Sequence, residues 1–397
     1  MKKQMLKTLA DIQTGPFGSQ LHKEDYVENG TPIVTVEHLG NRVFTEQNLP
    51  KVSDEDKERL EKYILAKGDI VFSRVGSVDR CSYVDAEHDG WMFSGRCLRV
   101  RSFSEVDPLY LYYFFCLEDT KQFVRNIAVG ATMPSINTKL LGEVEVSYPE
   151  LCVQKKIAAM LSAIDSRIEL NQKINNNLQQ QAQALFELWF VKFVPWGGVQ
   201  PSEWESAPLG TFVEIKRGGS PRPIQDFLAD SGLRWLKISD ATSLSSPYIL
   251  NIKEHIKEEG LRKTVFLNAG ELVLSNSATP GIPKILDVDS CIHDGWLYFP
   301  KSHLSKYYLY LFFIHIHKDL VALGNGSVFT NLKTDILKSF PTVKADKKTL
   351  QEFDALVAPL FEAMLNADRE NAKLTTLRDT LLPKLMSGEL DISDIDL

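Results

Sequence analysis

The sequence predicts an α+β fold in which two related globular domains alternate with two long helices. Three observations lead to this prediction: an internal repeat across both halves of the chain, short apolar strands bounded by glycine turns, and two long stretches with a sevenfold apolar period. The 397 residues suffice for two or three domains of ordinary size. We expect mixed or antiparallel sheets with flanking helices in each globular half.

The repeat consists of five segments that recur in the same order in the second half. They are a strand ending in a glycine turn, a strand after an acidic turn, a His-Asp-Gly-Trp tetrapeptide, an aromatic helix and a polar loop. The pairs are Leu6–Gly15 with Leu209–Gly218, Ala66–Arg74 with Asn268–Asn276, His88–Trp91 with His293–Trp296, Tyr110–Phe115 with Tyr308–Phe313, and Gly130–Leu141 with the segment that starts at Gly324. We interpret the two halves as two copies of one fold.

Each half ends in a stretch that predicts a long amphipathic helix. Residues 154–193 contain neither glycine nor proline, and residues 350–386 repeat their sevenfold period. Helices of this length extend beyond one domain, so we expect them to pack against each other as a coiled coil. The expected seam positions are Ile157, Leu161, Ile164, Ile168, Asn171, Leu178 and Leu185 in the first stretch, and Phe353, Leu360, Leu374 and Leu381 in the second.

Asn171 and Asn175 stand among the apolar seam positions. A buried asparagine in a seam sets register or orientation, whereas the same residues near a bend would face solvent, and both alternatives stay open. The expected divisions are a first globular domain at 1–150, its helix at 151–193, a linker rich in Gly, Pro and Trp at 194–205, a second globular domain at 206–345, its helix at 346–390 and an acidic tail at 391–397.

Composition narrows the class of protein. With 44% hydrophobic and 24% charged residues, the chain can bury a sizeable core and is not mainly disordered. The net charge of −7 argues against coating nucleic acid through bulk positive charge, so a DNA binder would need its basic residues on one face or a partner that supplies them. The five cysteines form no C-x-x-C pair, and no apolar run suits a membrane helix, which predicts a cytoplasmic protein without a zinc site.

The common catalytic motifs are missing from the sequence. It has no G-x-x-x-x-G-K-[ST] phosphate loop, and no Asn-Pro-Pro-Tyr or Asp-Pro-Pro-Tyr with which amino-methyltransferases hold a base. Gly324 and Gly326 follow an aromatic helix, so a dinucleotide site is not indicated, and His315 and His317 lie too close in sequence to share a helix face. The repeated His-Asp pairs are better explained as turns that precede a strand than as catalytic dyads.

Glycine-flanked polar loops recur at the ends of the predicted strands. Glycine permits close approach to phosphates, hydroxyl and amide groups bond phosphates or base edges, and arginine can bind guanine through two hydrogen bonds. Solvated connections would explain any single loop, but not their recurrence in order. The candidate DNA-binding residues are Thr14, Phe17, Ser19, Ser73, Arg74, Ser77, Arg80, Thr132 and Ser135 in the first half, and Lys216, Arg217, Ser220, Arg222, Asn276, Ser277, Thr279, Asn325, Ser327 and Lys333 in the second.

This arrangement resembles the specificity subunit of type I restriction-modification systems over nearly the whole chain. The opening of the first helix, QKKIAAMLSAIDSRIELNQKI, is typical of that family, as are SRVGSV in the first domain and LLPKLMSGEL at the end of the second helix. The main resemblance is the tandem order of target recognition domain, helix, target recognition domain and helix. It departs in the second half, where the loop lacks a counterpart of Pro134 and the helix has fewer Gln and Asn residues.

The resemblance implies a non-catalytic chain whose two target recognition domains each read one half of a bipartite, asymmetric site in double-stranded DNA. The two helices would pair as an antiparallel coiled coil with a pseudo-twofold axis and set the unread gap. The implied partners are two methyltransferase subunits, which use S-adenosylmethionine, and two restriction subunits, which use ATP and Mg. No cofactor is expected on this chain. The alternatives are a coiled-coil adaptor that does not read DNA and a divergent, self-contained DNA methyltransferase or nuclease.

Overall fold

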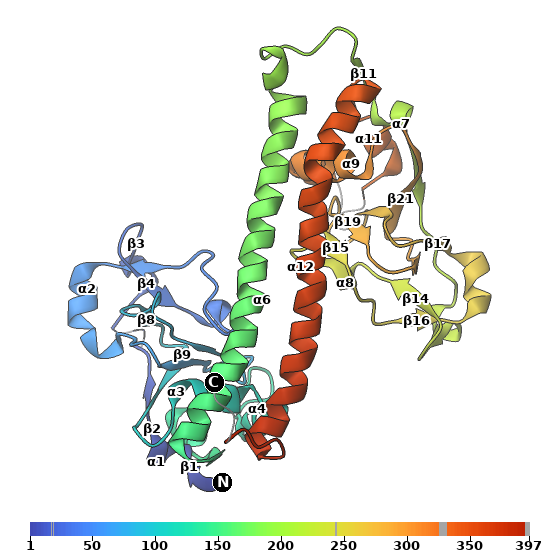
Figure 1. Cartoon of the computed structure of the whole chain (residues 1–397). Coiled ribbons are helices and arrows are strands. Elements are labelled where there is room, and N and C mark those ends of the chain that lie inside the picture. Colours follow the sequence, from blue (N-terminus) through green and yellow to red (C-terminus); the bar gives the residue numbers. More distant parts are fainter. Residues whose placement is uncertain (17, 19, 243, 325–331, 394–397) are drawn as a thin grey trace. The chain divides into compact units, whose positions relative to one another are not determined.

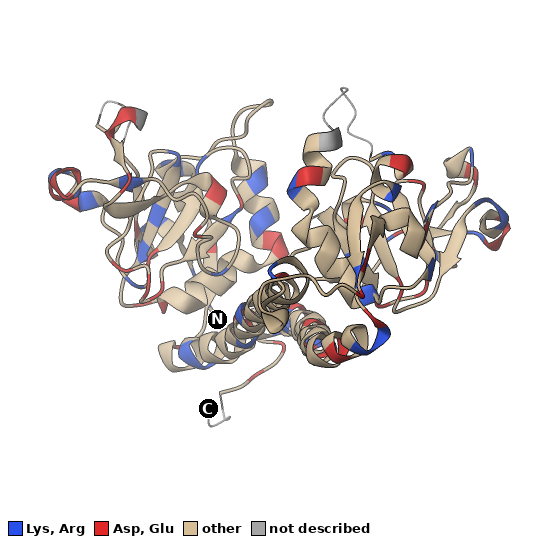
Figure 2. Ribbon diagram, turned by 90° about the horizontal axis from the view of Figure 1, so that it is seen from above, with Lys and Arg blue, Asp and Glu red and all other residues tan. Residues whose placement is uncertain are grey.

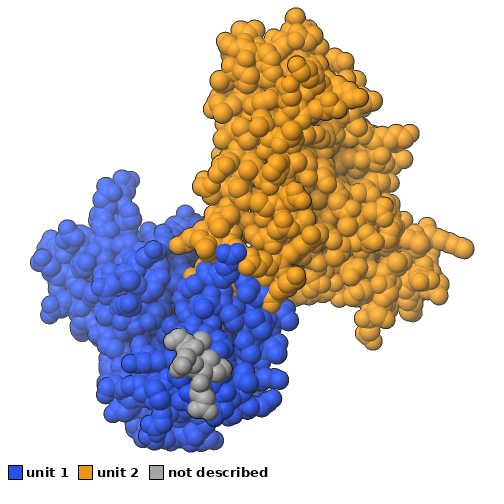
Figure 3. Space-filling model, viewed as in Figure 1, with its two compact units in different colours: residues 1–167, 374–397 blue, residues 168–373 orange. Residues whose placement is uncertain are grey.

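The computed structural model describes residues 1–16, 18, 20–242, 244–324 and 332–393. The chain divides into two compact units, unit 1 with residues 1–167 and 374–397 and unit 2 with residues 168–373 (Figure 3). Two long helices, α6 (Leu151–Phe186) and α12 (Lys347–Ser387), contribute residues to both units. In the part of the chain that is described, no helix has both the length and the apolar content that a membrane crossing requires.

Unit 1 combines two four-stranded sheets and a two-stranded ribbon with several helices (Figure 1). One sheet is antiparallel, in the order β2 (Ala10–Thr14), β9 (Cys97–Ser102), β6 (Ile70–Ser73) and β7 (Cys81–Tyr83). The other is mixed, in the order β3 (Tyr26–Val27), β5 (Lys51–Val52), β4 (Thr31–Val34) and β8 (Met92–Phe93). The ribbon pairs β1 (Lys2–Met5) with β10 (Glu145–Tyr148), and the α-helices are α1 (Leu6–Leu9), α2 (Asp54–Arg59), α3 (Pro108–Cys116), α4 (Glu118–Ile127) and α5 (Thr138–Gly142).

Unit 2 repeats this architecture with two five-stranded sheets. The first has the order β12 (Val213–Arg217), β21 (Trp296–Ser302), β18 (Leu272–Ser275), β19 (Pro283–Leu286) and β15 (Tyr248–Ile249). The second has the order β13 (Leu228–Ala229), β16 (His255–Ile256), β14 (Leu233–Leu236), β20 (Ser290–Ile292) and β17 (Val265–Leu267). The ribbon pairs β11 (Glu205–Pro208) with β22 (Pro341–Lys344), and the α-helices are α7 (Leu209–Phe212), α8 (Ser239–Thr242), α9 (Lys306–His315), α10 (His317–Gly324) and α11 (Thr334–Lys338).

Hydrogen bonds show which positions of the two units are equivalent. Ser94 N–H donates to Val34 O in unit 1, and His293 N–H donates to Leu236 O in unit 2. The strand that follows begins at Cys97 in one unit and at Trp296 in the other, where each pairs with a serine that ends the neighbouring strand. The turn Ser94–Arg96, here the β8–β9 turn, therefore corresponds to His293–Gly295, the β20–β21 turn.

This equivalence corrects one pair of the sequence repeat. The tetrapeptide at His88–Trp91 does not occupy the place of His293–Trp296. Asp89 accepts a hydrogen bond from Lys67 N–H, and its counterpart by that contact is Asp289, which accepts from Ala269 N–H at the same 2.8 Å. The shared letters are thus a coincidence of composition, and the two His-Asp pairs have different surroundings.

The aromatic helices α3 and α9 form the centre of each core. Their N-termini are capped by Asp107, which accepts from Leu109 N–H and Tyr110 N–H, and by Ser305, which accepts from Tyr308 N–H. Both helices are apolar on all sides and bury six consecutive aromatic or leucine side chains, as expected for a helix surrounded by protein. They place each sheet against the long helices.

In unit 1, the first part of α6 packs on the last part of α12. Ile157 and Leu161 share a core with Leu382, Leu385 and Met386. The seam residues Ile164, Leu374 and Leu381 are half-buried. Asp165 of α6 accepts a hydrogen bond of 2.9 Å from Arg378 of α12.

In unit 2, the remaining parts of the two helices are also in contact. Asn171 Nδ2 donates to Glu370 and to Asn371, both at 2.9 Å, and Asn175 Nδ2 donates to Asp368 at 2.7 Å. Neither asparagine faces solvent, since they are 2% and 8% exposed. Of the other seam residues in this unit, Phe353 is buried, and Ile168, Leu178, Leu185 and Leu360 are half-buried. As the residue numbers along α6 increase, those of the contacted residues on α12 decrease, so the two helices are antiparallel within the unit.

The first long helix changes its geometry near its end. The α-helix stops at Phe186, and a π-helical turn, Glu187–Val191, replaces its last residues. Phe193 adopts a left-handed backbone with φ 51°, which ends the helix before the expected linker. The aromatic side chains of Phe186 and Phe190 pack on Tyr308 and Phe353 there, and this packing overrides the local helix propensity.

Candidate nucleic-acid interface

In unit 1, the three polar loops predicted from the sequence meet at the β8–β9 turn. Gly15 N–H donates to Cys97 O at 3.2 Å, and Arg74 N–H donates to Arg96 O at 2.8 Å. Gly76 N–H donates to Pro134 O at 2.8 Å, which brings the third loop to the second. Gly15 is required at this point, because an added Cβ would lie 2.1 Å from Ser94 O. Residues distant in sequence thus share one end of the antiparallel sheet.

The candidate side chains of unit 1 differ in how far they are exposed. Ser77 and Thr132 are exposed, and Thr14, Arg74 and Ser135 are half-buried. Arg74 Nη1 donates to Gly95 O of the β8–β9 turn at 3.2 Å, whereas Arg80 is exposed and its guanidinium donates to Leu39 O beside Gly40. Phe17 and Ser19 lie outside the described residues.

Ser73 requires a correction. It is 2% exposed, and its hydroxyl donates to Val75 O at 2.7 Å inside the protein. Ser73 ends a strand whose four residues are all buried, so its side chain supports the loop from within and does not form part of the surface.

In unit 2, the equivalent loops meet at the β20–β21 turn. Gly218 N–H donates to Trp296 O at 2.9 Å, Asn276 N–H donates to Gly295 O at 2.8 Å, and Leu332 N–H donates to Asn276 O at 2.7 Å. An added Cβ at Gly295 would lie 2.5 Å from the Ser277 hydroxyl, whereas unit 1 has an arginine, Arg96, at the same place. The two units therefore present different side chains on one backbone frame.

The candidates of unit 2 also divide into surface and interior. Lys216, Arg217, Arg222, Thr279 and Lys333 are exposed, and Ser220 and Ser277 are half-buried. Asn276 corrects the prediction, because it is 3% exposed and lies beneath the turn. Lys216 pairs with Glu214 at 2.9 Å. Asn325 and Ser327 lie outside the described residues.

Asp294 is the centre of the basic residues in unit 2. Arg217 Nε donates to the Asp294 main-chain oxygen at 2.5 Å, and its guanidinium lies 3.8 Å from the Asp294 carboxylate. The Arg222 guanidinium lies 3.6 Å from the same carboxylate, and the Ser220 hydroxyl donates to it at 2.6 Å. These contacts, with the positive charges nearby, hold the pKa of Asp294 below its usual value in spite of its partial burial.

His293 completes this group as a neutral side chain. Gly295 N–H donates to His293 Nδ1 at 2.8 Å, so Nδ1 carries no hydrogen and Nε2 is the protonated nitrogen. Nε2 lies 3.1 Å from the Asp294 carboxylate, to which it donates. Burial lowers the pKa of His293, so the ring is uncharged at neutral pH and the group keeps one net positive charge from two arginines and one carboxylate.

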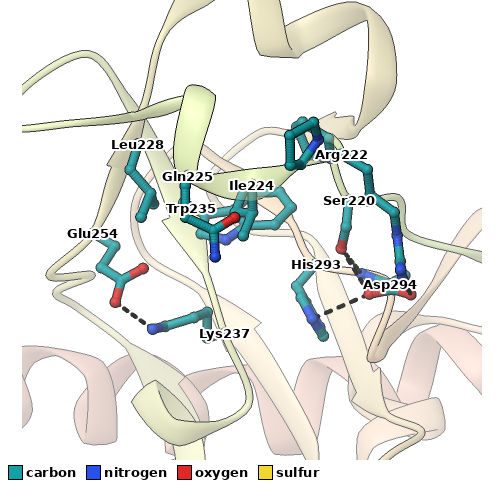
Figure 4. Close-up of a pocket in the computed structure, with 12 residues that line it drawn as sticks. Ser220, Arg222, Ile224, Gln225, Leu228, Trp235, Lys237, Glu254, His293 and Asp294 are labelled. Atoms are coloured by element: carbon teal, nitrogen blue, oxygen red, sulfur yellow. Dashed lines mark hydrogen bonds and ion pairs between the residues drawn. The ribbon is translucent and has the colours of Figure 1, made fainter.

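A pocket of about 640 Å³ opens beside this group (Figure 4). His293, Asp294, Ser220 and Arg222 lie at one side of it, and Lys237 and Glu254 form an ion pair at the other. Trp235 and Ile224 lie between them. A pocket with an apolar wall and charged rims can receive a flat polar group.

Sequence reasoning missed several residues at these turns. Arg96 is exposed at the position where three loops meet, but no motif marks it, because it lies in a short turn between strands. The sequence predicts only a turn at Asp294, because Arg217 and Arg222 come next to it only in the folded structure. Lys237 lies after another strand altogether.

Two further features of the described residues bear on DNA and metal binding: the distribution of charge and the arrangement of possible metal ligands. Lys and Arg are interspersed with Asp and Glu in each unit (Figure 2). Within the described residues, no group of three or more His, Cys, Asp or Glu side chains could hold a metal ion. His315 is exposed, and His317 Nδ1 lies 3.0 Å from Gly281 O.

Comparison with known proteins identifies the family. The sequence profile of the type I restriction modification DNA specificity domain matches residues 1–180 and 201–358. The type I restriction enzyme MjaIX specificity subunit of Methanocaldococcus jannaschii is 27% identical over 411 residues, covering 98% of this chain and 93% of the relative. The HindI specificity subunit of Haemophilus influenzae is 23% identical and covers 83% and 88%.

A solved structure shows the same fold. The S subunit of a type I restriction-modification system from M. genitalium has a TM-score of 0.63 at 16% identity, and the match covers 97% of this chain and 95% of that one. Fold and sequence comparison agree over both repeats and both long helices. The chain belongs to the family of type I restriction-modification specificity subunits.

Proposed function

We propose that this chain is the non-catalytic DNA reader of a type I restriction-modification complex. Residues 1–150 and 206–345 each read one half of a bipartite, asymmetric site in double-stranded DNA. The helices 151–193 and 346–390 pair as an antiparallel coiled coil, relate the two readers by a pseudo-twofold axis and set the unread gap. The observation that carries the proposal is the repeated frame: in each unit, polar loops from separate strands converge on one equivalent turn.

The same frame carries different chemistry in the two units, as the reading of an asymmetric site requires. An arginine donates to the middle carbonyl of each turn, Arg74 to Gly95 O and Arg217 to Asp294 O. These arginines come from different strands, and the exposed side chains around them differ. Such loops combine phosphate positioning with contacts to base edges.

The proposal assigns the chemistry to partner subunits. Two methyltransferase subunits with S-adenosylmethionine would modify the site, and two restriction subunits with ATP and Mg would cleave DNA. The chain would serve as their scaffold. A chain with net charge −7 leaves part of the phosphate neutralisation to those partners.

Methylome sequencing tests this function. A host that expresses the chain together with the methyltransferase subunit encoded beside it is compared with a host that lacks only the chain. We expect a two-part methylated motif with a constant gap that depends on the chain. Assembly without any new motif would favour the adaptor, and methyl transfer to DNA by the purified chain alone would favour a self-contained enzyme.

A further inference from the structure

We propose that Asp294 is a positioning residue that orients Arg222 to read a guanine in the half-site of unit 2. This inference rests on the proposed function, because it names the base chemistry of one of the two readers. It starts from the contacts of the Asp294 carboxylate, which binds Ser220, His293 and two arginines at the exposed end of a sheet.

Arg222 has the exposure that a reading residue needs. Its side chain is 81% exposed, against 52% for Arg217, which also donates to the main chain of Asp294. A guanidinium has five N–H donors in a planar fork. Arg222 lies beside Asp294 (Figure 4), where the ion pair at 3.6 Å restrains one side of the fork, and the high exposure of the side chain leaves its other donors accessible.

The carboxylate favours a base edge over a phosphate as the ligand. A phosphate bound by Arg222 would bring a second negative charge next to Asp294, so repulsion from this carboxylate would offset part of the attraction to the two arginines. The N7 and O6 atoms of guanine accept two hydrogen bonds from an arginine fork and carry no formal charge. Asp294 therefore reduces the free energy of guanine binding only slightly, and it orients the Arg222 fork before DNA binds.

Asp294 is itself well held in place. The Ser220 hydroxyl and His293 Nε2 both donate to its Oδ1. The equivalent position in unit 1 is Gly95, which has no side chain, so this device belongs to unit 2 alone. The difference predicts that the two half-sites are read by different chemistry.

Three variants of the complex test the proposal: Asp294→Asn, Arg222→Lys and Asp289→Asn. Asp294→Asn keeps the size of the side chain but removes its charge. Arg222→Lys keeps a positive charge but removes the fork, on a residue too exposed to affect folding. Asp289→Asn is the matched control. Asp289 is an exposed carboxylate of the same unit, and it accepts a hydrogen bond from the main-chain N–H of Ala269.

The measurements are the methylome of each variant complex and its affinity for duplexes that carry each base pair at each position of the site. We expect Arg222→Lys to lose about 5- to 150-fold of discrimination at one G·C pair. Asp294→Asn should relax the same position, while affinity for unrelated DNA stays equal or rises because a negative charge is removed. Asp289→Asn should change neither value.

The outcomes separate this inference from the proposed function. If the wild-type complex yields no bipartite motif, the proposed function fails, and the inference fails with it. If the wild-type complex yields the motif, and the Asp294→Asn and Arg222→Lys complexes have the same base preferences as the wild type, only the inference is overturned. It is also overturned if either variant loses affinity evenly across sequences, since that result indicates a phosphate contact or a purely structural role.

Discussion

Lys284 is a buried cation in unit 2. It is 3% exposed, and its ammonium donates to Leu244 O at 2.6 Å and to Ser246 O. Burial lowers its pKa to about 8, in spite of the nearby Asp368. Asp368 lies on α12 and accepts from Asn175 of α6 and from Ser246, so this network joins the sheet of the unit to both helices.

The lowered pKa of Lys284 predicts a pH-dependent stability. Between pH 8 and the ordinary value of 10.5, the folded protein has released the proton while the unfolded chain still binds it, so stability rises with pH. Relative to Lys284→Met, the wild type should gain up to about 3 kcal/mol over this range. Denaturant unfolding of both proteins at several pH values measures the difference.

Other groups that titrate in this range affect both proteins equally and cancel in the comparison. Lys333→Met, a substitution at an exposed position of the same unit, serves as the control and should differ from the wild type by a constant amount. A constant difference for Lys284→Met as well would show that its ammonium is not buried in solution.

Asp165 is a buried carboxylate on α6 in unit 1. It is 5% exposed and accepts from the Tyr113 hydroxyl at 2.6 Å and from Arg378 at 2.9 Å. Asp165→Leu leaves both donors without this acceptor, and we expect a loss of about 3 kcal/mol. Asp379→Leu removes the exposed carboxylate on the same arginine and should cost less than about 1 kcal/mol. Urea unfolding followed by circular dichroism distinguishes the two variants, and equal losses would contradict the burial of Asp165.

The sequence predicts little at the scale of single residues, for a physical reason. It gives residue types and loop positions, but the burial of a side chain and its hydrogen-bond partners depend on contacts between distant segments. Ser73 and Asn276 are polar residues of the kind common in surface loops, but both side chains are buried in the protein. Asp294 acquires its role only when Arg217 and Arg222 are folded against it.

At the scale of elements, the two long helices combine an apolar seam with a polar section. Asn171 and Asn175 lie in the seam and bond α12 in unit 2. A register shift would break these contacts and leave buried amides unpaired, which is costly. This polar section therefore specifies one register more strictly than leucines would.

An insertion in α6 tests whether the helix pair acts as a spacer. Inserting four residues after Asn176 lengthens the helix by about 6 Å, which is close to the rise of two base pairs. We expect the unread gap of the methylated motif to change, or the complex to fail to assemble because the register of Asn171 and Asn175 is lost. Four residues inserted at Gly197, in the linker, should leave the gap unchanged. Assembly with an unaltered gap in the α6 variant would refute the spacer role.

Elements were more predictable than residues. The seam period marked both long helices, because 3.6 residues per turn place every seventh side chain on one face. The π-helical turn at Glu187–Val191 is not predictable from the period, since it depends on packing against α9 and α12. The two copies of the His-Asp-Gly-Trp tetrapeptide do not occupy equivalent positions, because four matching letters say nothing of hydrogen bonding.

At the scale of the whole molecule, the number of DNA phosphates that Lys and Arg neutralise determines how DNA affinity responds to salt. The chain carries 45 basic and 52 acidic residues, and in each unit the two kinds are interspersed (Figure 2). We therefore expect this chain alone to neutralise few phosphates. The logarithm of the binding constant falls with the logarithm of salt concentration by about 0.9 for each phosphate neutralised.

We therefore predict a shallow salt dependence for the isolated chain and a steep one for the complex with its methyltransferase subunits. Fluorescence anisotropy with one labelled duplex, between about 50 and 200 mM salt, gives both slopes. The difference between the two slopes, divided by about 0.9, gives the number of phosphates that the partners contact. If the isolated chain already has the slope of the complex, its own basic residues hold the DNA, and the division of labour between reader and partners is wrong. If the slope steepens only with partners, the acidic net charge limits non-specific binding by the free reader and reserves DNA for the assembled complex.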